Sequence, residues 1–529
     1  MGGLHTVHGD GRVLLAGPAG LVDELAGHDH VVARPEPGVI IGRHTVSFTR
    51  RARHLGWDVD APILHDPQAF DGPFAPFPHQ RATAAFITMN QRGYVFNDPG
   101  TGKTAATIWA LRWMRRRGLI RRVLIVAPLS IIKDVWVNEI SRLDPEAAVW
   151  GVHSGGKPKP GKGELEDFAN ADYYIINHDA VKRFEDALRL DRSVDMVVID
   201  ESTAFKNPTA ARTKAMYRVV NKAAVPRRCI ALTGTPTPQS PLDCYGQVMI
   251  VTPDRLPGTY GRFRLQVMVE LGPHNWQPKT GWELVVSDIM QPAIRVRKED
   301  AIHLPPMVIE PHQVPLTPEQ EAAQKALVQA WQVELDNGVT ITPANAAVRV
   351  SKLLQLWQGM VIDDEGHARP VNAMPRVLAL MRLIDQTDGP VLVFTPYKAP
   401  QAMLARLMED AGIAHAVVNG DTPVGRRNAA FEAFRTGTLK VLLAHPRTTS
   451  HGLSFPQCNH IIWYGPTHSV ETYQQACERI ARPGQERVMT ITHIWATSVE
   501  KEVYNVVGSR IKQQAALLEL YRRTVGGML

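Results

Sequence analysis

Short apolar segments rich in β-branched residues recur in two parts of the chain and predict buried β-strands. Most of these segments are followed by a stretch of helical composition, and strands that alternate with helices indicate parallel sheets covered on both faces. Two such series predict an α/β fold with two parallel-sheet domains in tandem. The first series comprises GYVF, RVLIVAPLS, DYYIINH, DMVVIDES and RCIALTGTP, and the second comprises PVLVFTP, AHAVVNGD, KVLLAH, NHIIWYGP and MTITHIW.

Between residues 254 and 364 the alternation stops, and two amphipathic helical patterns take its place. The first opens with Thr317 and has Pro318 in its first turn, where proline is favoured. The second is ANAAVRVSKLLQLWQGM, and a third long pattern, from about Ser498 to Arg523, closes the chain. We therefore expect an N-terminal accessory region (1–75), a first α/β domain (76–303) with a helical insertion at about 254–300, a helical insertion and linker (304–370), and a second α/β domain (371–529).

The composition fits a globular protein with sizeable cores, since 44% of the 529 residues are hydrophobic and 21% are charged. No apolar run approaches the length of a bilayer span and no secretion signal opens the chain, so we expect a cytoplasmic protein without membrane contact. Four scattered cysteines without a CxxC pair indicate reduced, packed thiols rather than a zinc site. The net charge of +7 suits a polyanionic partner such as nucleic acid.

The segment YVFNDPGTGKTAATIWALRW combines a buried strand, a turn and a helix, which is the context that a phosphate-binding loop requires. Gly100 and Gly102 allow backbone N–H groups to turn toward phosphate oxygens, and the helix that starts near Lys103 adds its positive end. Lys103 would reach the β- and γ-phosphates, and the Thr104 hydroxyl would ligate Mg²⁺. The alternative is a strand-to-helix turn that ends in Gly-Lys-Thr by chance.

The segment DMVVIDESTAFKN places two adjacent carboxylates at the end of an apolar strand. Asp200 would hold the metal ion bound to the phosphates, and Glu201 would orient the attacking water. A solvated acidic turn is the alternative if this motif stood alone. Its position about one small domain downstream of the glycine-rich loop favours the catalytic interpretation.

A third polar strand end lies in ALTGTPTPQSPLDCYGQ. Hydroxyl groups and a glycine at a strand end can sense whether a γ-phosphate is present, which makes Thr233, Gly234 and Thr235 candidates for coupling. A polar turn without a function is the alternative for this motif.

The segment ETYQQACERIARPGQERV contains Arg479 and Arg482, three residues apart on a predicted helix and hence on one face. Arginine side chains can stabilise the charge of a phosphoryl-transfer transition state. A surface helix with solvated arginines is the alternative. A denser basic run, RWMRRRGLIRR, lies at a helix C-terminus, where we favour complementation of the helix dipole over nucleic-acid binding.

In this order, the motifs resemble those of the superfamily 2 helicase-like ATPases, specifically the Swi/Snf-type DNA translocases, over about Phe77 to Asn505. The closest likeness is to compact viral or bacterial members, which implies two RecA-like domains in a bacterial or virus-infected host cytoplasm. An amide or acidic residue at the position of Asn97 is common in that family. The corresponding segments are DPGTGKT (motif I), LIVAPLSIIKDVWVNEI (Ia), DEST (II), LTGTPTP (III), VLVFTP (IV), SHGLSF (V) and QACERIARPGQ (VI).

The resemblance implies further site residues and two departures. Thr203 stands where many relatives have His, and Ala481 and Pro483 stand where HRIGQ is common. The implied ATP-binding residues are Gln80, Asp98, Gly100, Thr101, Gly102, Lys103, Thr104 and Gly452. The implied coupling residues are Thr203, Thr233, Gly234, Thr235 and Gln475. The implied DNA contacts are Pro128, Leu129, Ser130, Asn177, His178, Thr395, Thr448 and Ser450.

The resemblance therefore predicts a DNA-stimulated ATPase that uses ATP and Mg²⁺ to translocate on duplex DNA during repair, replication or recombination. Because the implied contacts are to phosphate groups, DNA binding should be independent of sequence and should weaken with salt. Two other functions stay open at this point: a strand-separating DNA or RNA helicase, and a DNA-binding scaffold that does not hydrolyse ATP.

Overall fold

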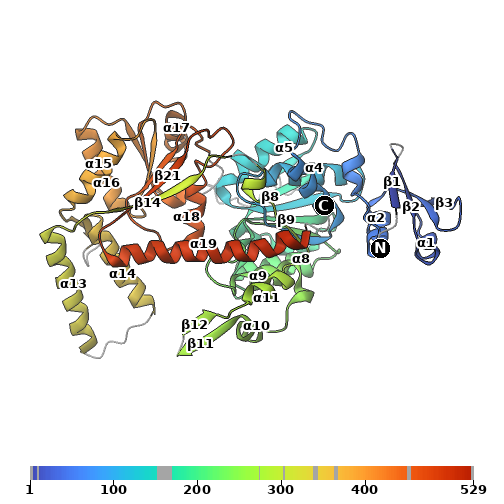
Figure 1. Cartoon of the computed structure of the whole chain (residues 1–529), viewed down its shortest axis with the longest axis horizontal. Coiled ribbons are helices and arrows are strands. Elements are labelled where there is room, and N and C mark those ends of the chain that lie inside the picture. Colours follow the sequence, from blue (N-terminus) through green and yellow to red (C-terminus); the bar gives the residue numbers. More distant parts are fainter. Residues whose placement is uncertain are drawn as a thin grey trace. The chain divides into compact units, whose positions relative to one another are not determined.

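The computed structural model describes residues 4–8, 11–151, 170–272, 275–301, 304–336, 343–362, 367–448 and 454–525 (Figure 1). The chain forms two compact units, one of Met1–Ala301 with Gln513–Leu529 and one of Ile302–Lys512. Each unit contains one large parallel sheet, so the predicted tandem of parallel-sheet α/β domains is confirmed. Among the helices that the structure describes, none combines the length and the apolar character that a bilayer crossing requires.

The first 65 or so residues form a small antiparallel module with its own apolar core, which includes Phe48 and Trp57. Helix α2 begins after Thr45, whose hydroxyl accepts a hydrogen bond from the Phe48 N–H at 3.3 Å and so caps the helix. The strand order is β1-β2-β4-β3. The elements are β1 (Leu4–Val7), β2 (Arg12–Ala16), α1 (Ala19–Ala26), β3 (Val31–Ala33), β4 (Val39–Arg43) and α2 (Val46–His54).

The large sheet of the first unit is parallel throughout and has the order β13-β5-β10-β9-β6-β8-β7. Apolar clusters cover both faces, as the β-branched segments predicted. Strand β10 lies between β5 and β9, so the strand ends that carry motifs I, II and III are neighbours. The strands are β5 (Arg92–Val95), β6 (Arg122–Ala127), β7 (Val149–Gly151), β8 (Tyr173–Asn177), β9 (Val194–Asp200), β10 (Arg228–Leu232) and β13 (Ala293–Ile294).

Helices connect these strands and pack against the sheet. The principal ones are α3 (Pro78–Met89), α4 (Lys103–Arg116), α5 (Asn138–Leu143), α7 (Glu185–Leu190), α8 (Ala211–Asn221) and α9 (Asp243–Val251). The basic run at the end of α4 makes contacts inside this unit: Arg112 donates to the Ala69 carbonyl oxygen, Arg115 pairs with Asp144, and Arg117 pairs with Asp66. Much of the run is therefore committed to internal structure.

The predicted helical insertion at 254–300 is only partly helical. It contains α10 (Tyr260–Val267), a hairpin of β11 (Met268–Gly272) and β12 (Asn275–Pro278), α11 (Trp282–Ile289), the short edge strand β13 and α12 (Lys298–Ala301). The strands of the hairpin and β13 have between two and five residues. Such short strands carry too few alternating positions to be recognised from the sequence.

The sheet of the second unit is also parallel and has the order β14-β21-β20-β17-β19-β18. Its edge strand, β14, lies in the range predicted as insertion and linker. Pro311 within this strand argues against a central strand but is compatible with an edge, where one row of N–H groups is unpaired. The strands are β14 (Met307–Gln313), β17 (Val391–Phe394), β18 (His415–Val418), β19 (Val441–Ala444), β20 (His460–Trp463) and β21 (Met489–Trp495).

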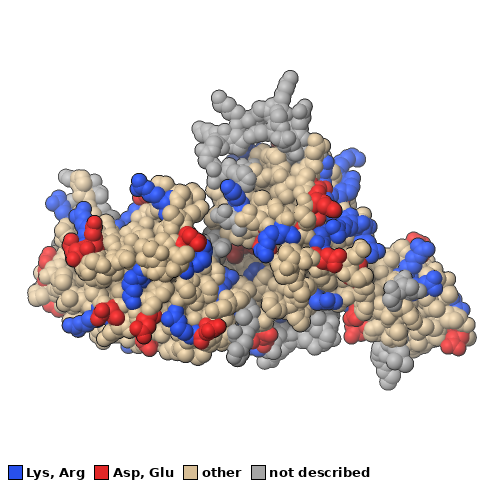
Figure 2. All heavy atoms as spheres, turned by 90° about the horizontal axis from the view of Figure 1, so that it is seen from above, with Lys and Arg blue, Asp and Glu red and all other residues tan. Residues whose placement is uncertain are grey.

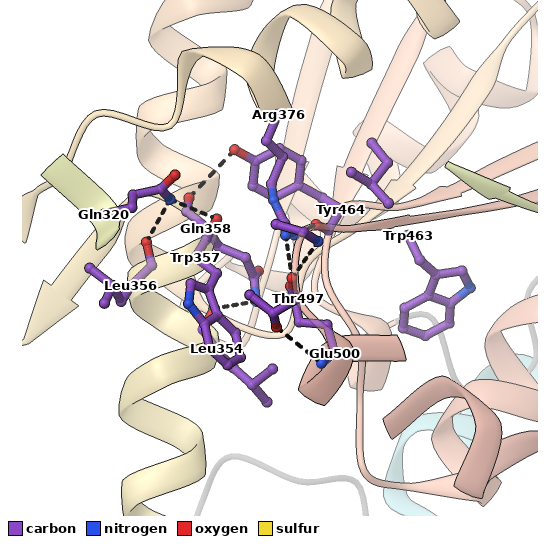
Figure 3. Close-up of polar contacts among 12 residues, drawn as sticks. Gln320, Leu354, Leu356, Trp357, Gln358, Arg376, Trp463, Tyr464, Thr497 and Glu500 are labelled. Atoms are coloured by element: carbon purple, nitrogen blue, oxygen red, sulfur yellow. Dashed lines mark hydrogen bonds and ion pairs between the residues drawn. The ribbon is translucent and has the colours of Figure 1, made fainter. Parts of the chain in front are cut away.

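The helices of the second unit are α13 (Pro318–Asp336), α14 (Pro343–Trp357), α15 (Met374–Asp385), α16 (Lys398–Asp410), α17 (Val424–Arg435) and α18 (Val470–Cys477), with α19 (Ser498–Val525) extending beyond it. Thr317 caps α13 as predicted, because its hydroxyl accepts from the Gln320 N–H and the Gln320 side chain accepts from the Thr317 N–H, both at 3.2 Å. The Gln320 amide also donates to the Leu356 and Trp357 carbonyl oxygens at 3.1 Å (Figure 3). These bonds join α13 to α14.

Candidate nucleotide-binding site

The loop between β5 and α4 has the conformation that a phosphate-binding loop needs. Gly100 and Gly102 have φ angles of 89° and 79°, in the left-handed region that favours glycine. A Cβ atom on Gly102 would lie 2.0 Å from Nε2 of Gln80, so a larger residue there would also clash. Helix α4 begins at Lys103, directly after the second glycine.

Asn97 and Asp98 anchor this loop to neighbouring segments. The buried Asn97 amide donates to Oγ1 of Thr83 at 2.8 Å and accepts from the Val296 N–H at 3.0 Å. Asp98 pairs with Arg295 at 2.7 Å and accepts from the Lys298 N–H at 2.9 Å. The Asn97 side chain therefore has a structural role, since its hydrogen bonds join the loop to α3 and to the segment that follows β13.

Two residues at the start of α3 hold the loop from the other side. The ring Nε2 of His79 lies 2.8 Å from the Thr101 carbonyl oxygen, and the Gln80 amide donates to the same oxygen at 3.4 Å. Gln80 is buried, and its side-chain oxygen accepts from the Phe77 N–H at 2.9 Å. The predicted adenine contact at Gln80 thus lies directly beside the loop.

Lys103 lies close to the acidic pair of motif II. Its amine donates to the Asn97 carbonyl oxygen at 2.6 Å. Burial lowers the pKa of Lys103, while the charges of Glu201, Asp200 and Asp98 oppose that shift. Burial raises the pKa of Asp200, even though its carboxylate accepts from Nε1 of Trp136 at 2.9 Å and from the Glu201 N–H at 3.0 Å. The loop lysine and the strand-end acids therefore form one electrostatic cluster.

The backbone of Glu201 is strained. Its φ of 50° is the one positive value among the described non-glycine residues. Left-handed backbone at a residue other than glycine costs free energy and is concentrated at functional sites. The Thr104 side chain lies in the first turn of α4, directly after the glycine-rich loop, and is partly exposed. The strain supports the interpretation of motif II as a functional turn.

The predicted coupling residues of motif III pack against the loop. A Cβ on Gly234 would lie 3.0 Å from Cδ of Pro99, so motif III and motif I are in close contact. Thr233 donates its N–H to the Val95 carbonyl oxygen at 3.1 Å, and its hydroxyl accepts from the Thr235 N–H at 3.1 Å. These coupling residues therefore follow β10 and lie beside the end of β5 and its loop.

Gln247 of α9 joins motif II to motif III. Its side-chain oxygen accepts from the Ser202 hydroxyl, and its amide donates to the Pro236 carbonyl oxygen, both at 2.8 Å. The neighbouring Gly246 is required sterically, because a Cβ there would lie 2.2 Å from the Phe205 carbonyl oxygen. The predicted coupling residue Thr203 is buried in the same turn.

The DNA contacts predicted in the first unit have different environments. Leu129 and Ser130 are exposed after β6, beside the partly exposed Pro128. Asn177 accepts from the Ala180 N–H at 2.9 Å and caps a short helix. His178 is directed inward, since its Nε2 lies 2.8 Å from the Asp200 carbonyl oxygen and burial lowers its pKa to about 4. The His178 side chain therefore supports motif II.

In the second unit the two arginines of motif VI do not share a helix face, which corrects the sequence prediction. Helix α18 ends at Cys477, and Arg479 and Arg482 lie in the turns that follow. Pro483 and Gly484, the latter with a φ of 93°, would stop a helix after Arg482, but α18 already ends before both arginines.

Hydrogen bonds to carbonyl oxygens hold both arginines. Nε of Arg479 donates to the Gln475 carbonyl oxygen at 2.7 Å, and Nε of Arg482 donates to that of Glu478 at 3.0 Å. Burial lowers the pKa of Arg482 to about 10. The segment is anchored by Gln485, whose amide donates to the Cys458 carbonyl oxygen at 2.8 Å. Gln475, predicted to couple, is buried on α18.

The remaining predicted DNA contacts of the second unit are less accessible than the prediction assumed. Thr395 is fully buried and its hydroxyl donates to the Gln358 side-chain oxygen at 2.9 Å, so this side chain stabilises the interior. Thr448 is partly exposed and donates to the His445 carbonyl oxygen at 2.7 Å. Ser450 and Gly452 lie outside the described residues.

Two protein-family models match this chain. Residues 79–368 match the SNF2-related domain, and residues 375–484 match the helicase conserved C-terminal domain. The chain belongs to the SNF2-related family. The resemblance to Swi/Snf-type helicase-like ATPases is confirmed, and this SNF2-related protein is an ATPase.

Individual relatives are distant but cover most of the chain. Protein p41 of Acyrthosiphon pisum secondary endosymbiont phage 1 is 26% identical over 85% of this chain and 99% of its own length. The uncharacterised ATP-dependent helicase YqhH of Bacillus subtilis is 24% identical over 86% of this chain and 80% of its own. The solved SWI2/SNF2 ATPase core of Sulfolobus solfataricus in complex with dsDNA is 18% identical, covers 87% of this chain and 97% of its own, and has a TM-score of 0.39.

Several residues of the SNF2-related site were not singled out from the sequence. They are His79, Trp136, Gln247 and Arg295, which bond the loop or the acidic turn directly. Trp136 and Gln247 lie within the quoted segments LIVAPLSIIKDVWVNEI and ALTGTPTPQSPLDCYGQ, which is the one signal that could have marked them. The partner of each is far away in sequence and is brought close only by the sheet order.

Proposed function

We propose that this protein couples ATP hydrolysis to movement along duplex DNA without full separation of the strands. The observation that carries the proposal is the cluster of Lys103, which follows β5, with Asp200 and Glu201 at the end of β9, beside a loop whose two glycines adopt left-handed backbone. Such a loop and a lysine suit the phosphates of ATP, and the carboxylates suit a metal ion and a water molecule.

In the proposed site the β- and γ-phosphates of ATP replace the Asn97 carbonyl oxygen as the partner of the Lys103 amine. The residues fit a magnesium ion, because the Asp200 carboxylate is buried and its raised pKa reflects a charge that a cation would stabilise. Asp200 and the Thr104 hydroxyl would hold Mg²⁺, which would neutralise phosphate charge.

Hydrolysis then requires a positioned water and a cation opposite the lysine. Glu201 orients the water and accepts its proton as the water oxygen attacks the γ-phosphorus and the bond to the β-phosphate oxygen breaks, leaving ADP and phosphate. Arg479 and Arg482 of the second unit supply positive charge to the transition state. Thr203, Thr233, Gly234, Thr235 and Gln475 transmit the presence of the γ-phosphate.

Contacts to the DNA backbone accompany this cycle. Exposed small or polar positions at strand ends, such as Ser130 after β6, and backbone amides suit a track of phosphates. The net charge of +7 favours association with a polyanion. Binding should therefore be independent of sequence and should weaken steeply with salt.

ATP hydrolysis titrated with single-stranded DNA, duplex DNA, forked DNA and RNA tests the proposal. We expect duplex DNA to give the largest stimulation, with no separation of a forked substrate. Glu201→Gln should remove the stimulated hydrolysis and leave DNA binding intact. Efficient unwinding of the fork would replace the proposal with a strand-separating helicase, and DNA binding without any hydrolysis would replace it with a scaffold.

A further inference from the structure

Two N–H donors fix the orientation of the Asp200 carboxylate at the end of β9. Nε1 of Trp136 donates to Oδ2 at 2.9 Å, and the Glu201 N–H donates to Oδ1 at 3.0 Å. Figure 2 shows many charged side chains on the surface of the molecule, where water can replace a lost hydrogen bond. Asp200 is only 7% exposed, so these two donors decide how its carboxylate lies.

The two donors do not supply the positive charge that a buried carboxylate attracts. Both are neutral, and Asp200 forms no ion pair with any residue that the structure describes. The nearby Lys103 amine donates to the Asn97 carbonyl oxygen instead. By contrast, Asp144 of the same unit is 3% exposed and pairs with Arg115 at 2.8 Å. Each oxygen of a carboxylate has two lone pairs, so both oxygens of Asp200 keep one for a cation.

Trp136 reaches Asp200 from a π-helical turn, η3 (Ile132–Val137), which lies between β6 and α5 and contacts β7 and β8. Such turns are rare and are frequently found at functional sites. The indole ring is 0% exposed and belongs to the apolar core on one face of the sheet. Because this packing fixes the ring, its N–H is held in place beside the carboxylate.

We propose that Trp136 is a positioning residue for the metal ion of the nucleotide-binding site. Its indole N–H holds Oδ2 of Asp200 so that the carboxylate keeps one orientation toward Mg²⁺. The ion demands a nearly ideal octahedral arrangement of oxygen ligands, so a carboxylate that rotates binds it less tightly. This inference rests on the proposed function, because it takes Asp200 as a ligand of Mg²⁺.

Trp109 of α4 provides a matched control for Trp136 in the same apolar core. It is also 0% exposed, and its Nε1 has no hydrogen-bond partner among the described residues. Its ring packs against those of Phe70 and Phe74, with centroid distances of 6.0 and 5.4 Å. Replacement by phenylalanine removes the same atoms at either position, but only Trp136→Phe removes a hydrogen bond to Asp200.

The affinity for a fluorescent, non-hydrolysable ATP analogue tests the proposal without relying on turnover. It is measured with Mg²⁺ and with EDTA in wild type, Trp136→Phe and Trp109→Phe. Loss of an outer hydrogen-bond partner of a metal ligand should weaken binding of the analogue to Trp136→Phe about tenfold with Mg²⁺ and less than about twofold in EDTA. Trp109→Phe loses no hydrogen bond and should stay within about twofold of wild type in both conditions.

A double-mutant cycle with Asp200→Asn shows whether Trp136 acts through the carboxylate. Asp200→Asn should remove most of the increase in affinity that Mg²⁺ causes in wild type. Adding Trp136→Phe to that variant should cause no further loss with Mg²⁺, because residues that act through one contact are not additive. Full additivity of the two losses would contradict the proposal.

The comparison of Mg²⁺ with EDTA separates the other ways in which the proposal could fail. Equal losses of affinity in the two conditions for Trp136→Phe would assign the tryptophan to packing of the core alone. An effect of Mg²⁺ as large as in wild type would refute the positioning role and leave the proposed function standing. A wild-type protein whose nucleotide affinity does not depend on Mg²⁺ would refute the metal site of the proposed function, and this inference with it.

Discussion

Each unit contains a cluster of buried or half-buried charged side chains, and the two clusters are built in opposite ways. In the second unit, Arg376 and Glu500 are 2% and 0% exposed and lie 2.6 Å apart. Arg376 also donates to the Tyr464 carbonyl oxygen at 2.6 Å (Figure 3). Glu500 also accepts from the Ala496 N–H at 2.7 Å. Burial opposes the charge of Arg376, but the carboxylate of Glu500 outweighs it and raises the pKa of Arg376.

In the first unit the balance is reversed. Burial outweighs the attraction of Glu201 and Asp200 and lowers the pKa of Lys103, whose amine bonds a carbonyl oxygen rather than a carboxylate. A closed ion pair such as Arg376–Glu500 already holds the partner that its charge needs. A lysine with a lowered pKa beside a glycine-rich loop is instead stabilised when an anion arrives. We therefore interpret Arg376–Glu500 as a structural ion pair and Lys103 as part of the proposed nucleotide-binding site.

The largest effect is expected at Lys103. Replacement by alanine should abolish measurable ATP hydrolysis, a loss of more than about 100-fold, because the phosphates lose their cation. DNA binding should persist. Steady-state hydrolysis with saturating duplex DNA measures the loss, and Lys222→Ala, at an exposed lysine of the same unit, is the control. Normal turnover in Lys103→Ala would remove the assigned role.

Arg482 belongs with Lys103 rather than with Arg376, because burial lowers its pKa to about 10 and its Nε bonds a carbonyl oxygen. Arg482→Ala should slow hydrolysis by about 100-fold or more. The loss should not reach the full range of arginine fingers, because Arg479 remains. ATP affinity should change only a few-fold. Rates and nucleotide affinity are measured together, and equal losses in both would contradict a transition-state role.

Arg376→Met should destabilise the second unit by about 3–5 kcal/mol, because the carboxylate of Glu500 would be left buried and unpaired. Chemical denaturation with a probe in the second unit measures this loss. The double variant Arg376→Met/Glu500→Leu should recover part of it, since no unpaired charge remains. If the single variant were as stable as wild type, the ion pair would have no structural role.

The sequence predicted those features that depend on local pattern. Apolar runs located most strands of both sheets, and the two glycines predicted a turn between β5 and α4 that presents backbone N–H groups. Contacts between remote segments could not be predicted in this way. The indole of Trp136 reaches Asp200, and Gln247 bridges two motifs, only because the sheet order brings those segments together.

Two other differences have local causes. The edge strand β14 was not predicted, because it contains Pro311 and proline is excluded from central strands. The spacing of Arg479 and Arg482 was interpreted as helical, although α18 ends at Cys477, before both residues. The ion pair between Arg376 and Glu500 could not be predicted from the sequence, since two charged residues separated so widely in sequence are more often solvated.

The smallest effect concerns pH and again separates the units. Burial lowers the pKa of His178 in the first unit, and of His460 and His493 in the second, to about 4. The folded protein keeps these rings neutral, while the unfolded chain takes up protons below pH ~6.5. Stability should therefore be full above pH ~6.5 and fall as the pH drops toward 4, more steeply in the second unit.

Denaturant unfolding at several pH values between about 7 and 4.5 checks this prediction. His493→Gln should flatten the decline of the second unit, because one of its histidines with a lowered pKa is removed. An equally steep decline in that variant would show that other groups control the acid response.

The most direct test is thermal unfolding of wild type, Lys103→Ala and Arg376→Met, each measured without nucleotide and with Mg²⁺ and a non-hydrolysable ATP analogue. It tests the claim that Lys103 serves to bind a phosphate group, whereas Arg376 serves to stabilise the fold. Lys103→Ala should keep or raise the melting temperature of the free protein and lose the increase that the nucleotide causes in wild type. Arg376→Met should lower the melting temperature of the free protein and keep that increase. A nucleotide-induced increase of wild-type size in Lys103→Ala would contradict the account.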